Sequence, residues 1–203
     1  MINKSSKILQ IFAKKPWKKF TFKEIKTQSK NKSESYVYNV VKDFVKLNVL
    51  KQNNVGNIIQ YSFAESQMAI SYISIAAEQS TLKEKHLPFK ELNEMQNIIP
   101  LKYYTLIITG SYANNKQTLK SDLDVVIICE NNTKNLYSEL RHYCEMSIPK
   151  IHLYAFTAKE FYNMLLEKQA NYGKEIVRNN LIFTGAEGYF RIVQEAMKNG
   201  FDG

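Results

Sequence analysis

One segment, residues 106–129, constrains the fold more than any other part of the chain. It reads LIITGSYANNKQTLKSDLDVVIIC, an apolar run that ends in Gly110-Ser111, then a polar loop, then a second apolar run that opens with Asp122 and Asp124. Apolar, β-branched runs of this length predict two strands joined by a loop. Because alternate residues of a strand face the same side, both carboxylates are expected to point the same way.

Two carboxylates on one strand face, beside a Gly-Ser turn with free backbone N–H groups, suit a divalent metal that holds a triphosphate. Asp122 and Asp124 are therefore the candidate metal ligands and catalytic residues. The alternative is a surface-exposed strand end without a metal.

Length and composition fit a globular chain. The 203 residues suffice for one large domain or two small ones, and 44% are hydrophobic and 23% charged. No apolar run approaches the roughly 20 residues that span a bilayer, and the first residues lack a signal-peptide pattern. The two cysteines, Cys129 and Cys144, form no CxxC pair. These features predict a cytoplasmic protein that does not contact membranes.

The net charge of +9 is concentrated at one end of the chain. Residues 1–66 contain 13 lysines and no arginine against four acids, whereas residues 67–203 hold 15 basic and 15 acidic residues. Such asymmetry predicts two modules, of which the first meets a polyanion.

Three helices and a hairpin are predicted in the N-terminal module. Apolar residues at helical spacing mark helices over residues 4–12 and 33–47. Between them, Thr21 and Glu24 have the capping-box spacing that starts another helix. Two strand-like runs around Gly56, which can adopt a positive φ, predict the hairpin.

This order resembles a winged helix-turn-helix domain. The resemblance implies binding to double-stranded DNA, with the helix over residues 33–47 in the major groove and the hairpin near the sugar-phosphate backbone of the DNA. The DNA-contacting residues it implies are Lys32, Ser33, Ser35, Tyr36, Asn39 and Lys51. The alternatives are a solvated lysine-rich face or a module for dimerisation or protein interaction.

A further helix is predicted over residues 67–78. It has more apolar residues than one buried face needs, and one interpretation is that they form a homodimer interface. Polar residues 79–85 follow as a linker. The predicted domains are therefore residues 1–66, a linker helix over residues 67–87, and residues 88–203.

Helices and strands are intermixed in the C-terminal module. Strands are predicted over residues 103–109, 122–129 and 150–156, with helices before the first strand and after each of the last two. Residues 173–198 read as largely helical, with a break at Thr184-Gly185. This predicts an α/β (α+β) fold with a short mixed sheet flanked by helices.

The stretch GSYANNKQTLKSDLD has Gly-Ser, ten residues, then Asp-x-Asp. It resembles the pattern of the DNA polymerase beta-like, minimal nucleotidyltransferase superfamily. The similarity extends to the flanking strands and to KEIVRNNLIFTGAEGYFRIV, and covers about residues 88–198.

The resemblance implies roles for individual residues. Gly110 and Ser111 would hold the triphosphate, with Lys120 and Ser121 close to the nucleotide. Asp122 and Asp124 would bind Mg²⁺ or Mn²⁺, and the substrate would be a nucleoside triphosphate, most simply ATP. Further cations available for phosphates are Lys116, Lys174 and Arg178.

One feature departs from the family pattern. Members usually carry a third carboxylate on a later strand, but the matching strand, KIHLYAF, contains no acid. His152 stands near the expected position as a substitute ligand or base, or as a structural residue. Glu145 and Glu160 flank this strand.

Three functions remain open. The first is an enzyme that transfers a nucleoside monophosphate, AMP most simply, to a hydroxyl of a protein, RNA or small molecule. Small proteins of this group often act as antitoxins that adenylylate a partner toxin, so the resemblance includes a protein target. The second is a DNA-binding regulator, or antitoxin-type protein, whose nucleotidyltransferase domain has degenerated. The third combines nucleic-acid modification with positioning by the winged helix.

Overall fold

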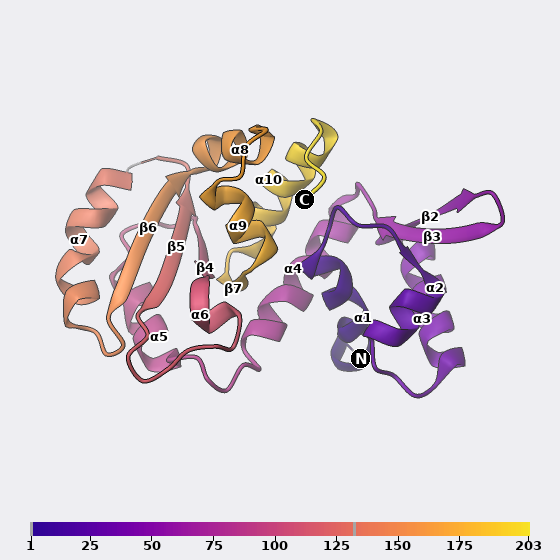
Figure 1. Ribbon diagram of the computed structural model, residues 1–203, viewed down its shortest axis with the longest axis horizontal. Helices are drawn as coiled ribbons and strands as arrows, with labels where there is room; N and C mark the ends of the chain where they lie inside the picture. The colour runs from indigo at the N-terminus through magenta and orange to yellow at the C-terminus, as the bar shows by residue number, and fades with distance from the viewer. Residues whose placement is uncertain (1, 132) are drawn as a thin grey trace.

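The computed structural model describes residues 2–131 and 133–203, which form two modules joined along one helix (Figure 1). The N-terminal elements are α1 (Ile2–Lys14), β1 (Phe20–Thr21), α2 (Phe22–Gln28), α3 (Glu34–Lys46), β2 (Leu50–Val55) and β3 (Ile58–Phe63). The joining helix is α4 (Gln67–Thr81). The C-terminal elements are α5 (Phe89–Ile98), β4 (Thr105–Ile108), α6 (Gly110–Ala113), β5 (Leu123–Cys129), α7 (Thr133–Met146), β6 (Ile151–Thr157), α8 (Ala158–Leu166), α9 (Tyr172–Arg178), β7 (Leu181–Thr184) and α10 (Ala186–Lys198).

Local sequence signals account for the N-terminal elements. Thr21 and Glu24 form the predicted capping box at the start of α2, and the Ser33 side chain caps α3. Gly56 has a φ of +58° and turns the chain between β2 and β3. The three predicted helices and the hairpin are confirmed. A two-residue strand, β1, adds to them and pairs with β3, which gives a sheet in the order β1-β3-β2.

The C-terminal sheet has the order β6-β5-β4-β7. The β5 and β6 strands are parallel, and the other neighbours are antiparallel, so the predicted mixed sheet is confirmed. The largely helical prediction for residues 173–198 was wrong at β7, which forms an edge strand on β4. Gly185, with a φ of +74°, ends this strand and begins α10.

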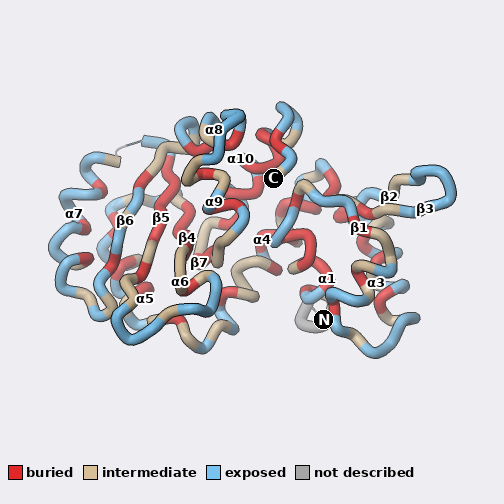
Figure 2. The backbone as a smooth tube through the Cα atoms, in the orientation of Figure 1, coloured by how far each residue is buried: buried red, intermediate tan, exposed pale blue. Residues whose placement is uncertain are grey.

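The two faces of this sheet are covered by different helices. Leu123, Val125 and Ile127 pack into one core with residues of α5 and α7. Val126 and Ile128 pack into the other core, with residues of α8, α9 and α10. The central strands are accordingly almost continuously buried (Figure 2). Asp124 shares its side of β5 with Val126, so it lies on the α8–α10 face.

The helix α4 packs against both modules. Its residues Ala69, Ile70, Ile73 and Ala76 are buried, in contacts with α1, α10 and β7. The apolar excess that suggested a dimer interface is thus largely used within the chain. One continuous core runs from Ile8 in α1 to residues of α10. No helix in the described part of the chain is long and apolar enough to cross a bilayer.

Candidate functional site

The turn after β4 is built around Gly110, which has a φ of +65° and begins the short helix α6. The preceding residue, Thr109, donates its N–H to the carbonyl oxygen of Asp124 at 3.0 Å. A Cβ on Gly110 would overlap Oδ2 of Asp124. Glycine is therefore required here both by the backbone conformation and by the seating of the Asp124 carboxylate.

Asp122 and Asp124 converge on one imidazole. His152 lies opposite Asp124 in the parallel β5–β6 register. Its Nε2 is 3.2 Å from Oδ2 of Asp122, and its Nδ1 is 3.6 Å from Oδ1 of Asp124. The three side chains therefore lie on the same side of the sheet, as the strand alternation predicted for the two carboxylates.

The electrostatics of Asp124 are those of a partly buried anion. Burial raises the pKa of its carboxyl and the neighbouring Asp122 raises it further, while the contact with His152 lowers it. Its side chain is 27% exposed, against 42% for Asp122. Two carboxylates held together in this way favour a cation between them.

The donor set fits a divalent cation only in part. Among residues 2–131 and 133–203, no three His, Cys, Asp or Glu side chains are arranged to enclose a metal ion. Mg²⁺ is commonly held by one or two carboxylates, with substrate phosphates and water completing its coordination. Asp122 and Asp124 fit that role together with a bound triphosphate.

No acid replaces the missing third carboxylate in the described part of the chain. Glu145 pairs with Arg141 on α7, and the Glu160 carboxylate accepts hydrogen bonds from Thr157 in the capping box of α8. The position next to Asp124 belongs to His152, whose side chain is 47% exposed.

Two of the cations suggested for phosphate binding already donate hydrogen bonds to main-chain carbonyl oxygens. Lys174 donates to the carbonyl oxygen of Glu167, and Arg178 donates to that of Gly203. Lys116 and Lys120 are exposed on the loop between α6 and β5.

The hydroxyl of Ser121 accepts the N–H of Thr118 at 2.9 Å and so closes a turn in this loop. Ser111 follows directly on Gly110, in the first turn of α6. The structure thus gathers Gly110, Ser111, Asp122 and Asp124, and leaves Lys120 and Ser121 on the adjoining loop.

Two residues of the site had no sequence signal. Asn179 donates its side-chain N–H to the Gly110 carbonyl at 3.2 Å, and the Tyr172 hydroxyl lies 3.2 Å from Oγ1 of Thr109. Burial raises the pKa of Tyr172 to about 12, and its ring packs 4.8 Å from that of Tyr154. These contacts join positions 69 and 63 residues apart, so no local spacing marks them.

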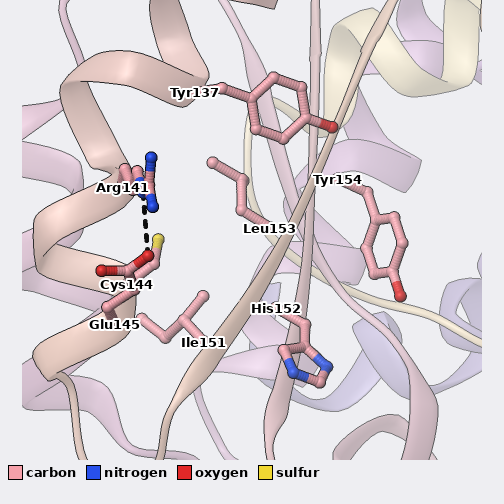
Figure 3. A pocket seen from close by; sticks show the side chains of 8 residues that line it. All are labelled: Tyr137, Arg141, Cys144, Glu145, Ile151, His152, Leu153 and Tyr154. Atoms are coloured by element: carbon pink, nitrogen blue, oxygen red, sulfur yellow. Dashed lines mark hydrogen bonds and ion pairs between the residues drawn. The ribbon is translucent and has the colours of Figure 1, made fainter.

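Two cavities adjoin the site through His152 and Asn179, and Asp122 and Asp124 line neither of them. One, of about 470 Å³, runs along β6 and includes His152 (Figure 3). The other, of about 510 Å³, lies over α9 and is lined by Tyr172, Arg178 and Asn179 among others.

The residues predicted to bind DNA fall into two places. Lys32, Ser33, Ser35 and Asn39 are exposed at or near the beginning of α3, whereas Tyr36 is half-buried. The Ser33 hydroxyl accepts the N–H of Tyr36 at 3.2 Å. Lys51 is on β2, where it lines a separate cavity of about 580 Å³ with Trp17 and Lys19.

Comparison with known proteins agrees with this geometry. Residues 90–181 match the family model of the nucleotidyltransferase domain, a range that contains Gly110, Ser111, Asp122, Asp124 and His152. No curated protein and no solved structure matches the chain. The match supports a general nucleotidyl transfer function for this domain.

Proposed function

We propose that the protein binds a nucleoside triphosphate with Mg²⁺ or Mn²⁺ and transfers the nucleoside monophosphate to a hydroxyl group. ATP is the simplest donor and AMP the group transferred. The observation that carries this proposal is the convergence of Asp122 and Asp124 beside the Gly110 turn. All of these residues lie inside the matched range.

In this proposal each group has a distinct task. The Gly110 turn and the Ser111 hydroxyl hold the terminal phosphates, while Asp122 and Asp124 hold the cation. A bound divalent cation would neutralise the triphosphate and align the α-phosphate for in-line attack. His152 is partly exposed beside the carboxylates, and its imidazole takes the proton of the attacking hydroxyl.

The two cavities suggest how the substrates are arranged. The cavity over α9 adjoins the Gly110 turn through Asn179, and Tyr172 offers an aromatic face there. We assign the nucleoside to this side. The groove along β6, which contains His152, is then left for the acceptor.

The N-terminal module is proposed to be a winged helix-turn-helix domain that binds double-stranded DNA. The order of its elements and its charge support this assignment, because helix, strand, two helices and a hairpin carry the whole net positive charge of the chain. Exposed polar residues at the beginning of α3 would face the major groove.

A second candidate function is a DNA-binding regulator whose nucleotidyltransferase domain has lost catalysis. The observation in its favour is that His152, a residue without negative charge, stands between the two carboxylates. An antitoxin-type protein that acts on a partner toxin remains within the first proposal as one choice of acceptor.

Label transfer tests the proposed reaction. ATP labelled at the α-phosphate should transfer label, in the presence of Mg²⁺ or Mn²⁺, to a Ser/Thr/Tyr peptide library, bulk tRNA or a small polyol. ATP labelled at the γ-phosphate should transfer none. Asp122→Asn and Asp124→Asn should each lower transfer by at least 100-fold, the size of effect expected for groups that stabilise transition-state charge. Glu130→Gln, an exposed acid at the end of β5, is the matched control.

A substitution at position 152 separates the two candidates. His152→Asp supplies an acid at the position next to Asp124, so it should keep or raise transfer if the domain is an enzyme. His152→Ala should lower it. The parent and both His152 variants could all fail to transfer label while ATP with Mn²⁺ still raises their melting temperatures. That result would favour the second candidate, a regulator whose nucleotidyltransferase domain has lost catalysis.

A further inference from the structure

The strand β6 is an open edge of the C-terminal sheet. Within the part of the chain that the structure describes, it pairs with β5 alone, because the strand order is β6-β5-β4-β7. In a parallel ladder, alternate residues turn both main-chain groups toward the same neighbour. The carbonyl oxygen of Lys150 accepts from Leu123 of β5, so residues of the same parity face β5. Ile151, Leu153 and Ala155 therefore direct their N–H and C=O groups outward.

One end of this edge is already closed by a side chain. The outward N–H of Ala155 donates to the hydroxyl of Tyr137 from α7 at 2.8 Å. The outward groups of Leu153 have no partner among residues 2–131 and 133–203. An unpaired donor and acceptor at strand spacing are the groups with which an extended backbone pairs.

The groove of about 470 Å³ wraps around this open edge (Figure 3). On one side, the strand residues Ile151 and Leu153 lie toward Arg141 and Cys144 of α7. On the other side lie His152 and Tyr154, on the face that carries the carboxylates. A strand added to β6 would place its side chains alternately on these two sides.

We propose that the acceptor is a polypeptide, bound as an extended strand on the outer edge of β6, which presents a Ser, Thr or Tyr hydroxyl beside His152. This assignment rests on the proposed nucleotidyl transfer. The hydroxyl oxygen forms a bond to the α-phosphorus, the bond from that phosphorus to the bridging oxygen breaks, and pyrophosphate leaves with the electron pair. The hydroxyl proton passes to His152.

The chemistry of the edge favours a peptide over a nucleic acid. Its free groups are a backbone donor and acceptor, which pair with another backbone, and its α7 wall consists of Tyr137, Cys144 and the Arg141–Glu145 ion pair. Arg141 lines the groove together with Glu145, with which it pairs, and the exposed Lys150 directly precedes Ile151 at the beginning of β6. We therefore expect acidic residues beside the acceptor hydroxyl.

Peptide binding without nucleotide tests this site. The probe is a positional-scanning library of octapeptides with a central Ser, Thr or Tyr, added to ¹⁵N-labelled protein. Acidic members should slow hydrogen exchange at the Leu153 amide at least tenfold. Leu153→Pro, which removes the outward N–H at an edge position that tolerates proline, should weaken binding at least tenfold. Arg141→Glu should shift the preference from acidic to basic peptides, a change that misfolding would not produce.

Three results would overturn the assignment. They are the absence of binding by any octapeptide, binding that leaves the Leu153 amide unprotected, and protection that needs no peptide and grows with protein concentration. The last result would identify a second copy of the chain as the occupant. Because no nucleotide is present, these failures leave the proposed reaction standing, whereas a failure of label transfer with intact peptide binding would refute the reaction alone.

Discussion

Gly110 ties the backbone turn of the site to the position of Asp124. A methyl group at Gly110 would collide with the Asp124 carboxylate, and the φ of +65° is strained for any L-residue. We expect Gly110→Ala to lower the free energy of unfolding by about 1–3 kcal/mol, the range for strained backbone, and to abolish the thermal shift given by ATP with Mn²⁺.

Gly188 offers a matched control for that substitution. A Cβ on Gly188, inside α10, would meet only Oγ1 of Thr105 at an ordinary 3.4 Å. Gly188→Ala should therefore be neutral or stabilising by about 0.4–1 kcal/mol in urea unfolding. If both alanine variants behaved alike, the special role of Gly110 would be refuted.

The ionised carboxylate of Asp124 should lower the free energy of unfolding at neutral pH. Burial raises the pKa of its carboxyl, so the native state binds a proton more readily than the unfolded chain. The unfolding free energy then falls as pH rises from the unfolded pKa, about 3.9, through the raised native pKa. We expect Asp124→Asn to be more stable than the parent at pH 7, because the amide carries no charge that burial disfavours. The gain should be about 0.5–2 kcal/mol, the usual size of a single stabilising substitution. The gain should vanish below about pH 4.

Urea unfolding at pH 7 and at pH 3.5 measures this difference. Glu130→Gln, at an exposed acid, should change stability little at either pH. An Asp124→Asn protein that is less stable than the parent at pH 7 would show that the carboxylate is satisfied in the free protein.

The residues that carry the site were only partly predictable. Gly110, Ser111, Asp122 and Asp124 lie within 15 positions of one another, so strand alternation and spacing alone identify them. Asn179 and Tyr172 reach the same turn through α9, and only the tertiary fold brings them there. The contact that requires glycine at position 110 could not be predicted either, because it needs the packed β4–β5 pair.

At the scale of elements, α4 is the piece on which both modules depend. Ile73 in this helix is fully buried, whereas Ile75 is 43% exposed. Ile73→Ala should cost about 2–5 kcal/mol, the usual range for a buried isoleucine, and Ile75→Ala only about 0.5 kcal/mol or less.

The single tryptophan makes the consequence measurable. Trp17 of the N-terminal module packs against Phe201, with ring centroids 5.6 Å apart. Tryptophan fluorescence and far-UV circular dichroism should therefore report one transition, shifted together by Ile73→Ala. Two separate transitions would show that the modules unfold independently and that the shared core contributes little.

The beginning of α3 and the hairpin carry the proposed DNA contacts. Replacing Lys32 and Lys51 by alanine should weaken binding to duplex DNA, because fewer backbone phosphates are neutralised. The slope of log Kd against log salt concentration should flatten by about 0.9 for each phosphate that the variant no longer neutralises. Fluorescence anisotropy with a labelled duplex measures both effects.

The matched control replaces Lys159 and Lys168, two exposed lysines of the C-terminal module. It should leave the salt dependence unchanged. Duplex binding that is absent, or insensitive to salt in the parent protein, would remove the DNA-binding proposal.

The elements themselves were predicted where caps and periodicity are strong. The capping-box spacing of Thr21 and Glu24 predicts the beginning of α2, and the structure contains that box. The structure has a second capping box at Thr157, where α8 begins. The strand β7 was missed because it has four residues and lies between helices, where local periodicity favours a helix. Its pairing with β4 depends on the whole sheet.

At the scale of the molecule, the chain is less divided than its charge suggests. The net positive charge comes from residues 1–66, yet one core extends from α1 through α4 to α10. Sequence reveals where charge changes, but it does not reveal which apolar faces meet. The predicted linker helix is therefore a shared structural element, and the proposed nucleotide site and the proposed DNA-binding surface belong to one packed body (Figure 1).

In the function proposed for this protein, Gly110, Ser111, Asp122 and Asp124 hold a nucleoside triphosphate through a divalent cation. A crystal structure with Mn²⁺ and a non-reacting ATP analogue tests it most directly, because Mn²⁺ is located by its anomalous signal. We expect a Mn²⁺ peak between the carboxylates of Asp122 and Asp124, with the triphosphate against the Gly110 turn. A nucleotide bound elsewhere, or His152 still joining the two carboxylates with no Mn²⁺ beside them, would contradict it.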